Sequence, residues 1–208
     1  GVVDPEDSTL GPAASINHVS VGYIPAGRDK GSVISAFFFA KELVKEFPYA
    51  RVGIINYGIP GQGIDKWSLM LNGGIYNIHK KMIDNAMARL GGSGWKNTVS
   101  VILWNQGGGD RQSQTSYYRA QLDRVIEQYR SNDWGRGVPF QVSDYDYAPV
   151  QYRTQNPVLK GLNTDDSLLT TCVSSANLEL QIDNLHWTPE SHEKMGKRRY
   201  ESFMATYA

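Results

Sequence analysis

The stretch Q-I-D-N-L-H-W at residues 181–187 carries an aspartate and a histidine three residues apart. They lie in a loop or first turn just before the predicted final helix. Because they are only three residues apart, this short segment could present the side chains of Asp183 and His186 to the same point. A histidine that takes a proton from a hydroxyl becomes a cation, and a neighbouring carboxylate fixes its tautomer and stabilises that charge. Histidine suits this exchange near neutral pH. The pair is a candidate general base, although the spacing also fits a surface histidine at a helix start.

Two glycine-rich loops are the other candidates for chemistry. Residues 98–110 read T-V-S-V-I-L-W-N-Q-G-G-G-D, an apolar run that stops abruptly before Gln106. Residues 58–67 read G-I-P-G-Q-G-I-D-K-W and also follow an apolar run. Glycine lets backbone N–H groups approach a ligand, so Gly61 could offer an unhindered donor, and the Gln106 amide donates without carrying charge. The alternative is that both stretches are glycine-rich turns without a ligand.

Metal and cofactor chemistry find little support in the sequence. The other histidines, His18, His79 and His192, have no metal-ligand spacing with His186, so we expect no metal. The lone Cys172 excludes a disulfide framework and a cysteine-based metal site. The spacing G-I-P-G-Q-G is not the dinucleotide-binding pattern G-x-G-x-x-G. We therefore expect no cofactor.

Charge and hydropathy narrow the classes of partner. Twenty-one basic residues balance twenty-one acidic ones, so no overall field would attract nucleic acid or an anionic membrane. No apolar run approaches the roughly 20 residues needed to span a bilayer. No signal peptide is visible, and the chain begins with Gly1, which fits a processed protein or a fragment.

The elements that must position these loops follow from apolar periodicity. It predicts helices over residues 34–47, 75–90, 113–130 and 150–162. The capping residues predict a last helix, with Thr188 at its N-cap and Pro189 at its first position. The apolar pattern predicts strands over residues 51–57, 99–103, 138–143 and 168–174, and a short strand near 16–21 within an otherwise irregular segment 1–33. This alternation predicts one α/β domain over 1–208: three α/β/α layers around a doubly wound parallel sheet. Ligands bind such sheets beyond the carboxyl ends of the strands.

Taken together, the three loops resemble the SGNH/GDSL hydrolase superfamily, and more closely its sialate O-acetylesterase-like branch of carbohydrate esterases. The resemblance covers roughly residues 32–205 and implies the flavodoxin-like SGNH fold. The sequence departs from the family pattern at Gly108 and Gly109, where the family usually has Glu-Ser. A side chain that normally braces the loop is therefore missing. Three blocks carry the resemblance: W-x-Q-G-x-x-D at Trp104, Gln106, Gly107 and Asp110; a second block matched at Gly61, Ile64 and Trp67; and D-x-x-H at Asp183 and His186.

The resemblance implies a role for each matched residue. His186 would be the general base and then the general acid, and Asp183 would orient it. The backbone N–H of Gly61 and the side-chain amide of Gln106 would hold the oxyanion of the tetrahedral intermediate. Three tryptophans would flank the site and could stack on a sugar ring, or they could simply pack in the core or at the rim: Trp67, Trp104 and Trp187.

The nucleophile is not identifiable in this chain, because the family's G-Q-S-N or G-D-S block after the first strand is not found. Three alternatives stay open. The serine precedes Gly1, and another segment or chain supplies the first strand. Residues 16–22 are that strand, and Ile24 stands in place of the serine in a degenerate site. Or a local serine such as Ser8 acts, although the residues before Ser8 cannot form a buried strand.

The leading hypothesis is a serine esterase that hydrolyses O-acetyl or similar short acyl esters on carbohydrate through a Ser-His-Asp triad. An O-acylated carbohydrate is then the partner. The rival hypothesis is a catalytically degenerate carbohydrate-binding or structural module, for example of a phage tail. Because such domains also occur in phage tail spikes, an extracellular or virion-associated setting is favoured.

Overall fold

The computed structural model describes residues 19–22, 34–69, 74–91, 97–164 and 169–207. Predicted and observed elements agree closely along most of this part of the chain. The strands are β1 (Val19–Gly22), β2 (Val52–Ile55), β3 (Ile102–Leu103), β4 (Phe140–Ser143) and β5 (Thr170–Val173). The α-helices are α1 (Ser35–Glu46), α2 (Gly74–Gly91), α3 (Thr115–Arg130), α4 (Asn156–Gly161) and α5 (Pro189–Tyr207).

All pairings between these strands are parallel, as the alternation of strands and helices predicts. β1 pairs with β2, with Val19 opposite Val52, and β3, β4 and β5 form a second group in that order. The backbone N–H of Trp104 continues the β3–β4 pairing beyond the strand, donating to Gln141 O at 2.7 Å. The loops after β3, β4 and β5 therefore leave the sheet at one edge.

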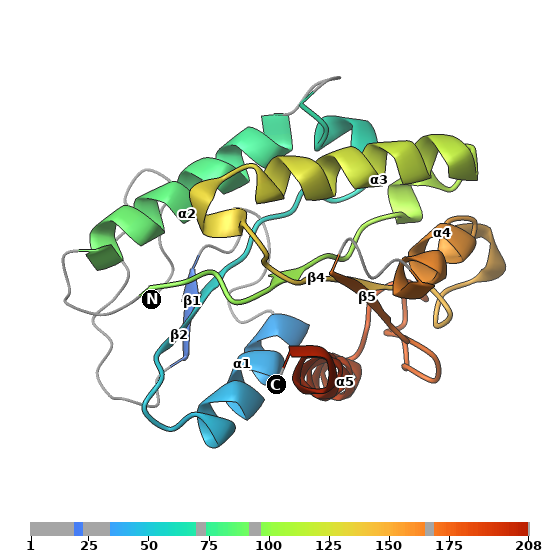
Figure 1. Ribbon diagram of the computed structural model, residues 1–208. Coiled ribbons are helices and arrows are strands. Elements are labelled where there is room, and N and C mark those ends of the chain that lie inside the picture. The colour runs from blue at the N-terminus through green and yellow to red at the C-terminus, as the bar shows by residue number, and fades with distance from the viewer. Residues whose placement is uncertain (1–18, 23–33, 70–73, 92–96, 165–168, 208) are drawn as a thin grey trace.

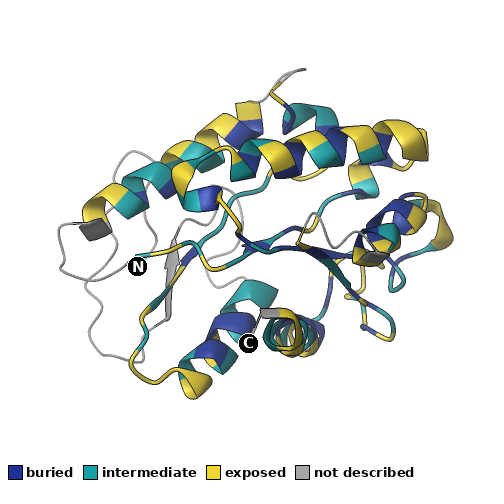
Figure 2. Cartoon of the chain, in the orientation of Figure 1, coloured by how far each residue is buried: buried dark blue, intermediate teal, exposed yellow. Residues whose placement is uncertain are grey.

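Helices cover both faces of the sheet. In Figure 1, α2 and α3 lie on one side of the strands and α1 and α5 on the other. The predicted stripe of α3 is buried against the sheet: Tyr118, Leu122, Val125 and Tyr129 are at most 1% exposed. Figure 2 shows the same two-sidedness, with dark buried stripes on the sheet side of the helices and exposed residues outside. The fold is consistent with an SGNH-like α/β/α architecture, which confirms the predicted class.

Two predicted elements are corrected. The strand over 99–103 is ordered as β3 only at Ile102–Leu103, because the facing Pro139 accepts a hydrogen bond from Ile102 N but has no N–H to donate. The helix over 150–162 is broken into a 3₁₀ turn at Val150–Tyr152 and the short α4. Pro157 explains the break, since proline in a helix interior removes a hydrogen bond and clashes with the preceding turn.

A strand is present close to where the sequence predicts one before residue 34. β1 at Val19–Gly22 overlaps the strand predicted near residues 16–21 and pairs along its whole length with β2. The alternative in which another segment supplies a serine-bearing strand stays a prediction. Residues 1–18 and 23–33, which include Ser8 and Ile24, lie outside the described residues. No helix in the described ranges is both long and apolar enough to cross a membrane.

Candidate active site

The loop with the predicted catalytic pair is a tight hairpin-like turn between β5 and α5. Leu180 and Trp187 form an antiparallel bridge, and Gln181 N donates to His186 O at 2.7 Å. The Gln181 side chain adds a bond from Nε2 to Trp187 O at 2.7 Å. Asn184 at the tip has a φ of 54°, a left-handed conformation that asparagine tolerates better than most residues. Backbone geometry thus fixes the positions of Asp183 and His186.

Asp183 and His186 form the hydrogen-bonded pair that their spacing predicts. Asp183 Oδ2 lies 2.5 Å from His186 Nδ1, and Asp183 Oδ1 accepts the backbone N–H groups of Leu185 and His186 at 3.0 Å each. The bonds from His186 and Leu185 lower the pKa of Asp183 to about 2, so it is a carboxylate at any working pH. A carboxylate only accepts, so Nδ1 carries the hydrogen and Nε2 is left as the base.

The start of α5 anchors this loop as the sequence predicts. Thr188 Oγ1 accepts the N–H of Ser191 at 3.2 Å, which is the N-cap bond, and Pro189 is the first helical residue. Ser191 Oγ in turn accepts the N–H of Glu179 at 2.7 Å, on the other side of the loop. The His186 side chain stays 54% exposed, so a substrate can reach it.

Gln106, on the loop after β3, forms hydrogen bonds both within its own loop and to the loop after β2. Its Nε2 donates to Asp110 Oδ2 at 2.5 Å and to Gln62 O at 3.2 Å, and its Oε1 accepts from the Tyr118 hydroxyl at 3.2 Å. Gln62 follows Gly61, which has a φ of 72° and is exposed. The structure therefore places the Gln106 side chain against Gln62, the neighbour of Gly61 in the chain, with both amide hydrogens of Gln106 engaged.

A chain of aromatic contacts joins the Gln106 loop to the His186 loop. A Cβ on Gly107 would lie 3.2 Å from the ring of Tyr145, which follows β4. Tyr145 stacks on Tyr147 at 5.7 Å between ring centroids, and Tyr147 contacts the ring of Trp187 edge-on at 5.1 Å. The loops after β3, β4 and β5 thus form one continuous rim, with His186 next to the last ring of the chain. Burial raises the pKa of Tyr145 to about 12, so its hydroxyl stays protonated.

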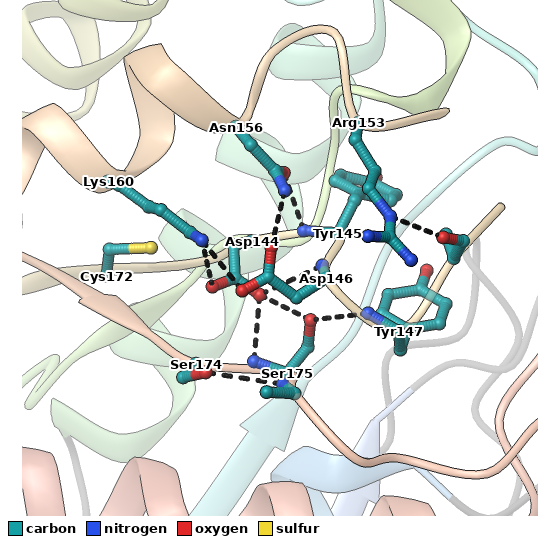
Figure 3. A network of polar contacts seen from close by, with 12 residues as sticks. Asp144, Tyr145, Asp146, Tyr147, Arg153, Asn156, Lys160, Cys172, Ser174 and Ser175 are labelled. Carbon is teal, nitrogen blue, oxygen red and sulfur yellow. Dashed lines mark hydrogen bonds and ion pairs between the residues drawn. The ribbon is translucent and has the colours of Figure 1, made fainter. Parts of the chain in front are cut away.

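A polar network around Asp144 holds this rim in place (Figure 3). The Asp144 carboxylate is 2% exposed and accepts hydrogen bonds from both the backbone and the hydroxyl of Ser175, which follows β5. Lys160 of α4 lies 2.7 Å from Asp146 Oδ2 and 3.8 Å from Asp144 Oδ2, and Asn156 Nδ2 donates to Asp146 Oδ1 at 2.8 Å. The network fastens the loop after β4 both to α4 and to the loop after β5.

The three predicted sugar-stacking tryptophans are buried. Trp67 and Trp104 pack against each other at 4.8 Å in the main core, and Trp187 packs on Tyr147. Their exposed fractions are 7%, 4% and 5%. In this conformation they pack in the core and offer no open ring face, so sugar stacking stays a prediction.

The described residues were searched for a nucleophile and for a metal site. β1 ends at Gly22, so the positions where the family's serine would follow the strand fall outside the described residues. Cys172 lies on β5, where burial raises its pKa to about 12, so it is a thiol and a poor nucleophile. Within the described ranges, no three His, Cys, Asp or Glu residues cluster as a metal site would require.

Sequence reasoning missed the Asp144 network and the tyrosine contacts. Their signal was present in S-D-Y-D-Y, residues 143–147, where acids and aromatics follow a strand directly at the ligand-binding edge of the sheet. Asp110 was matched only as a motif position, without a role.

Comparison with known proteins places these features in context. The profile of a family described as "Carbohydrate esterase, sialic acid-specific acetylesterase" (SASA) matches residues 17–205, which include β1 and all three loops. The crystal structure of a protein from Arabidopsis thaliana superposes with a TM-score of 0.63 and 18% identity, covering 82% of this chain and 67% of that one. At that identity the likeness concerns the fold alone. No curated protein matches the sequence.

Proposed function

The chain belongs to the SASA family of carbohydrate esterases, and from this membership we propose that it hydrolyses O-acetyl or similar short acyl esters of carbohydrates. The observation that carries the proposal is the Asp183–His186 pair. Its 2.5 Å bond to Nδ1 leaves Nε2 of an exposed imidazole as the only basic ring nitrogen. Among the described residues no hydrogen bond occupies Nε2, so it is available to a hydroxyl.

The proposed reaction proceeds in two acyl transfers. His186 Nε2 removes the proton of a serine hydroxyl as the oxygen attacks the ester carbonyl carbon. The resulting imidazolium, stabilised by Asp183, then protonates the departing sugar oxygen. In the second half His186 takes a proton from water as the water oxygen attacks the acyl carbon. It then returns that proton to the serine oxygen as the bond between the acyl carbon and the serine breaks, which releases the carboxylic acid.

The oxyanion formed in each half would be stabilised by the Gly61 N–H and the Gln106 amide. The support is that Gln106 Nε2 binds the carbonyl of Gln62, the residue next to Gly61. Because both amide hydrogens of Gln106 are engaged, the oxyanion would have to replace one acceptor. The 3.2 Å bond to the neutral Gln62 carbonyl is longer than the 2.5 Å bond to the Asp110 carboxylate and is the one we expect to exchange.

The test is release of acetate from an O-acetylated carbohydrate and of nitrophenol from p-nitrophenyl acetate. We expect turnover by the wild type and a loss of at least about 10³-fold in His186→Ala, since the base is then missing. Glu190→Gln, an exposed change in the first turn of α5, is the matched control and should keep its activity. Turnover that persists unchanged in His186→Ala contradicts the proposal.

A second candidate function, a carbohydrate-binding module without catalysis, is favoured by one observation. The first serine after β1 is Ser32, ten positions beyond Gly22, whereas the family's serine follows the strand directly. A fluorophosphonate probe that labels active serines separates the two functions. Labelling that requires His186, mapped to one serine by mass spectrometry, supports the esterase. No labelling and no turnover, together with retained glycan binding, support the binding module.

A further inference from the structure

We infer that Asp110 is the positioning residue of the proposed oxyanion site, an inference that rests on the proposed function. One of its carboxylate oxygens, Oδ2, accepts both the Gln106 amide at 2.5 Å and the backbone N–H of Ile64 at 2.9 Å. A single buried acceptor therefore sets the orientation of one oxyanion donor and holds the loop that carries the other, Gly61.

We call the Asp110 carboxylate with its two donors, the Gln106 amide and the Ile64 N–H, the Asp110 clamp. The surroundings of Asp110 make this clamp rigid. The side chain is 5% exposed, and burial raises the pKa of its carboxyl group. Its own backbone carbonyl accepts a bond from Gln155 Nε2 at 2.8 Å, and Gln155 Nε2 also donates to Ser113 O at 3.0 Å. The Gln106 amide and the Ile64 N–H donate to the same buried oxygen, so the positions of the two donors are fixed relative to each other.

The glycines around Asp110 allow the two loops to meet. A Cβ on Gly109 would lie 2.6 Å from the carbonyl oxygen of Gln62, and a Cβ on Gly63 would lie 3.1 Å from Asp110 Oδ1. Side chains at these positions would push the loop after β2 away from the loop after β3. Gly109 and the Gln62 carbonyl therefore approach each other directly, with no room for a side chain between them.

The clamp predicts how variants combine. If Asp110 acts through Gln106, removal of either side chain removes the same oriented donor, which typically costs about 10²–10³-fold in kcat. We expect Asp110→Ala and Gln106→Ala each to lower kcat by about 10²-fold with little change in KM. The double variant should lose no more than about threefold beyond either single one, because the two residues form one unit.

Asp110→Asn distinguishes a loss of the clamp from a general loss of folding. It is nearly isosteric, and its amide oxygen can still accept from Gln106 and Ile64, so we expect a loss of about five- to tenfold, between wild type and Asp110→Ala. The matched control is Asp65→Asn. It removes a nearby carboxylate on the loop after β2, one paired with Lys66, and should leave turnover within about twofold.

A second readout tests the clamp without activity. By NMR, we expect the Ile64 amide to exchange at least tenfold faster in Asp110→Ala and the Gln106 side-chain amide signals to move, both unchanged in Asp65→Asn. Wild-type turnover with additive losses in the double variant overturns the inference. An absence of wild-type turnover defeats the proposed function, and the NMR signals then decide the clamp alone: unchanged Ile64 and Gln106 signals in Asp110→Ala overturn it.

Discussion

The Asp183 carboxylate determines which nitrogen of His186 carries the hydrogen. With a pKa of about 2 it stays ionised, and as an acceptor it requires a hydrogen on Nδ1. Its second oxygen is held by two backbone N–H groups, so it cannot rotate away without breaking them. The bond to Nδ1 therefore leaves Nε2 as the basic nitrogen of the ring.

Asp183→Asn tests this dependence. An asparagine amide facing Nδ1 would favour the opposite tautomer, with the hydrogen on Nε2, so we expect kcat to fall by about 10²–10⁴-fold while the fold is kept. The measurement is p-nitrophenyl acetate hydrolysis beside the far-ultraviolet circular dichroism spectrum. A variant as active as Glu190→Gln would mean that His186 does not depend on this carboxylate.

His79 links protonation to stability. Its Nδ1 accepts the Tyr129 hydroxyl at 2.6 Å and its Nε2 faces Ile55 O at 3.4 Å, so the neutral ring joins α2 to α3 and β2. Burial lowers the pKa of His79 to about 4, below the ordinary value of 6.5. Between these values the unfolded chain binds a proton that the folded chain does not. The stabilisation is thus complete above about pH 6.5 and is lost as the pH falls toward 4.

His79→Gln should flatten this pH dependence. Between pH 7 and pH 5 we expect the wild type to lose about 1–2 kcal/mol more of its free energy of unfolding than His79→Gln does. Urea unfolding at both pH values measures the difference. His192, whose pKa burial also lowers to about 4, is present in both proteins and cancels. Equal losses in the two proteins would show that His79 does not titrate in this range.

Among the elements, the contact between the two glycine-rich loops makes a specific demand on Gly109. A Cβ there would lie 2.6 Å from the Gln62 carbonyl oxygen, a backbone atom that cannot rotate aside. We expect Gly109→Ala to lower the free energy of unfolding by about 1–3 kcal/mol and to reduce turnover. Gly58→Ala, in the facing loop after β2 but with nothing within 4 Å of its Cβ, is the control for thermal and kinetic measurements. Equal melting temperatures for the two variants would contradict the contact.

The sequence predicted these elements wherever local pattern decides them. Apolar periodicity was sufficient for α1, α2 and α3, and the Thr188-Pro189 signal predicted the start of α5 correctly. The break near Pro157 was missed because a periodic apolar pattern outweighed a single proline. The role of Asp110 could not be predicted, since it depends on Ile64, 46 residues away, reaching it through the fold.

At the scale of the whole molecule, the candidate active site requires loops from separate strands to meet at the edge of the sheet where the strands end. The helix layers on both faces of the sheet hold that edge in place. α1 and α5 form the layer below the sheet in Figure 1 and pack closely where Gly196 faces α1. A Cβ on Gly196 would lie 2.6 Å from Ser35 O and 2.9 Å from Phe39 N. The layer therefore tolerates no side chain at this position.

Gly196→Ala asks whether that layer also sets the geometry of the site. Forcing α1 from α5 should lower the free energy of unfolding by about 1–3 kcal/mol. Gly161→Ala in α4, where the Cβ meets nothing within 4 Å, should be neutral or slightly stabilising. The loop that carries Asp183 and His186 is closed by its own hydrogen bond from Gln181 N to His186 O, so turnover per folded molecule should not change. Thermal unfolding and turnover well below the melting temperature measure both. If Gly196→Ala stays folded but loses turnover, a displacement of α5 changes the position of Asp183 and His186. The loop that carries this pair then depends on the helix layer for its geometry.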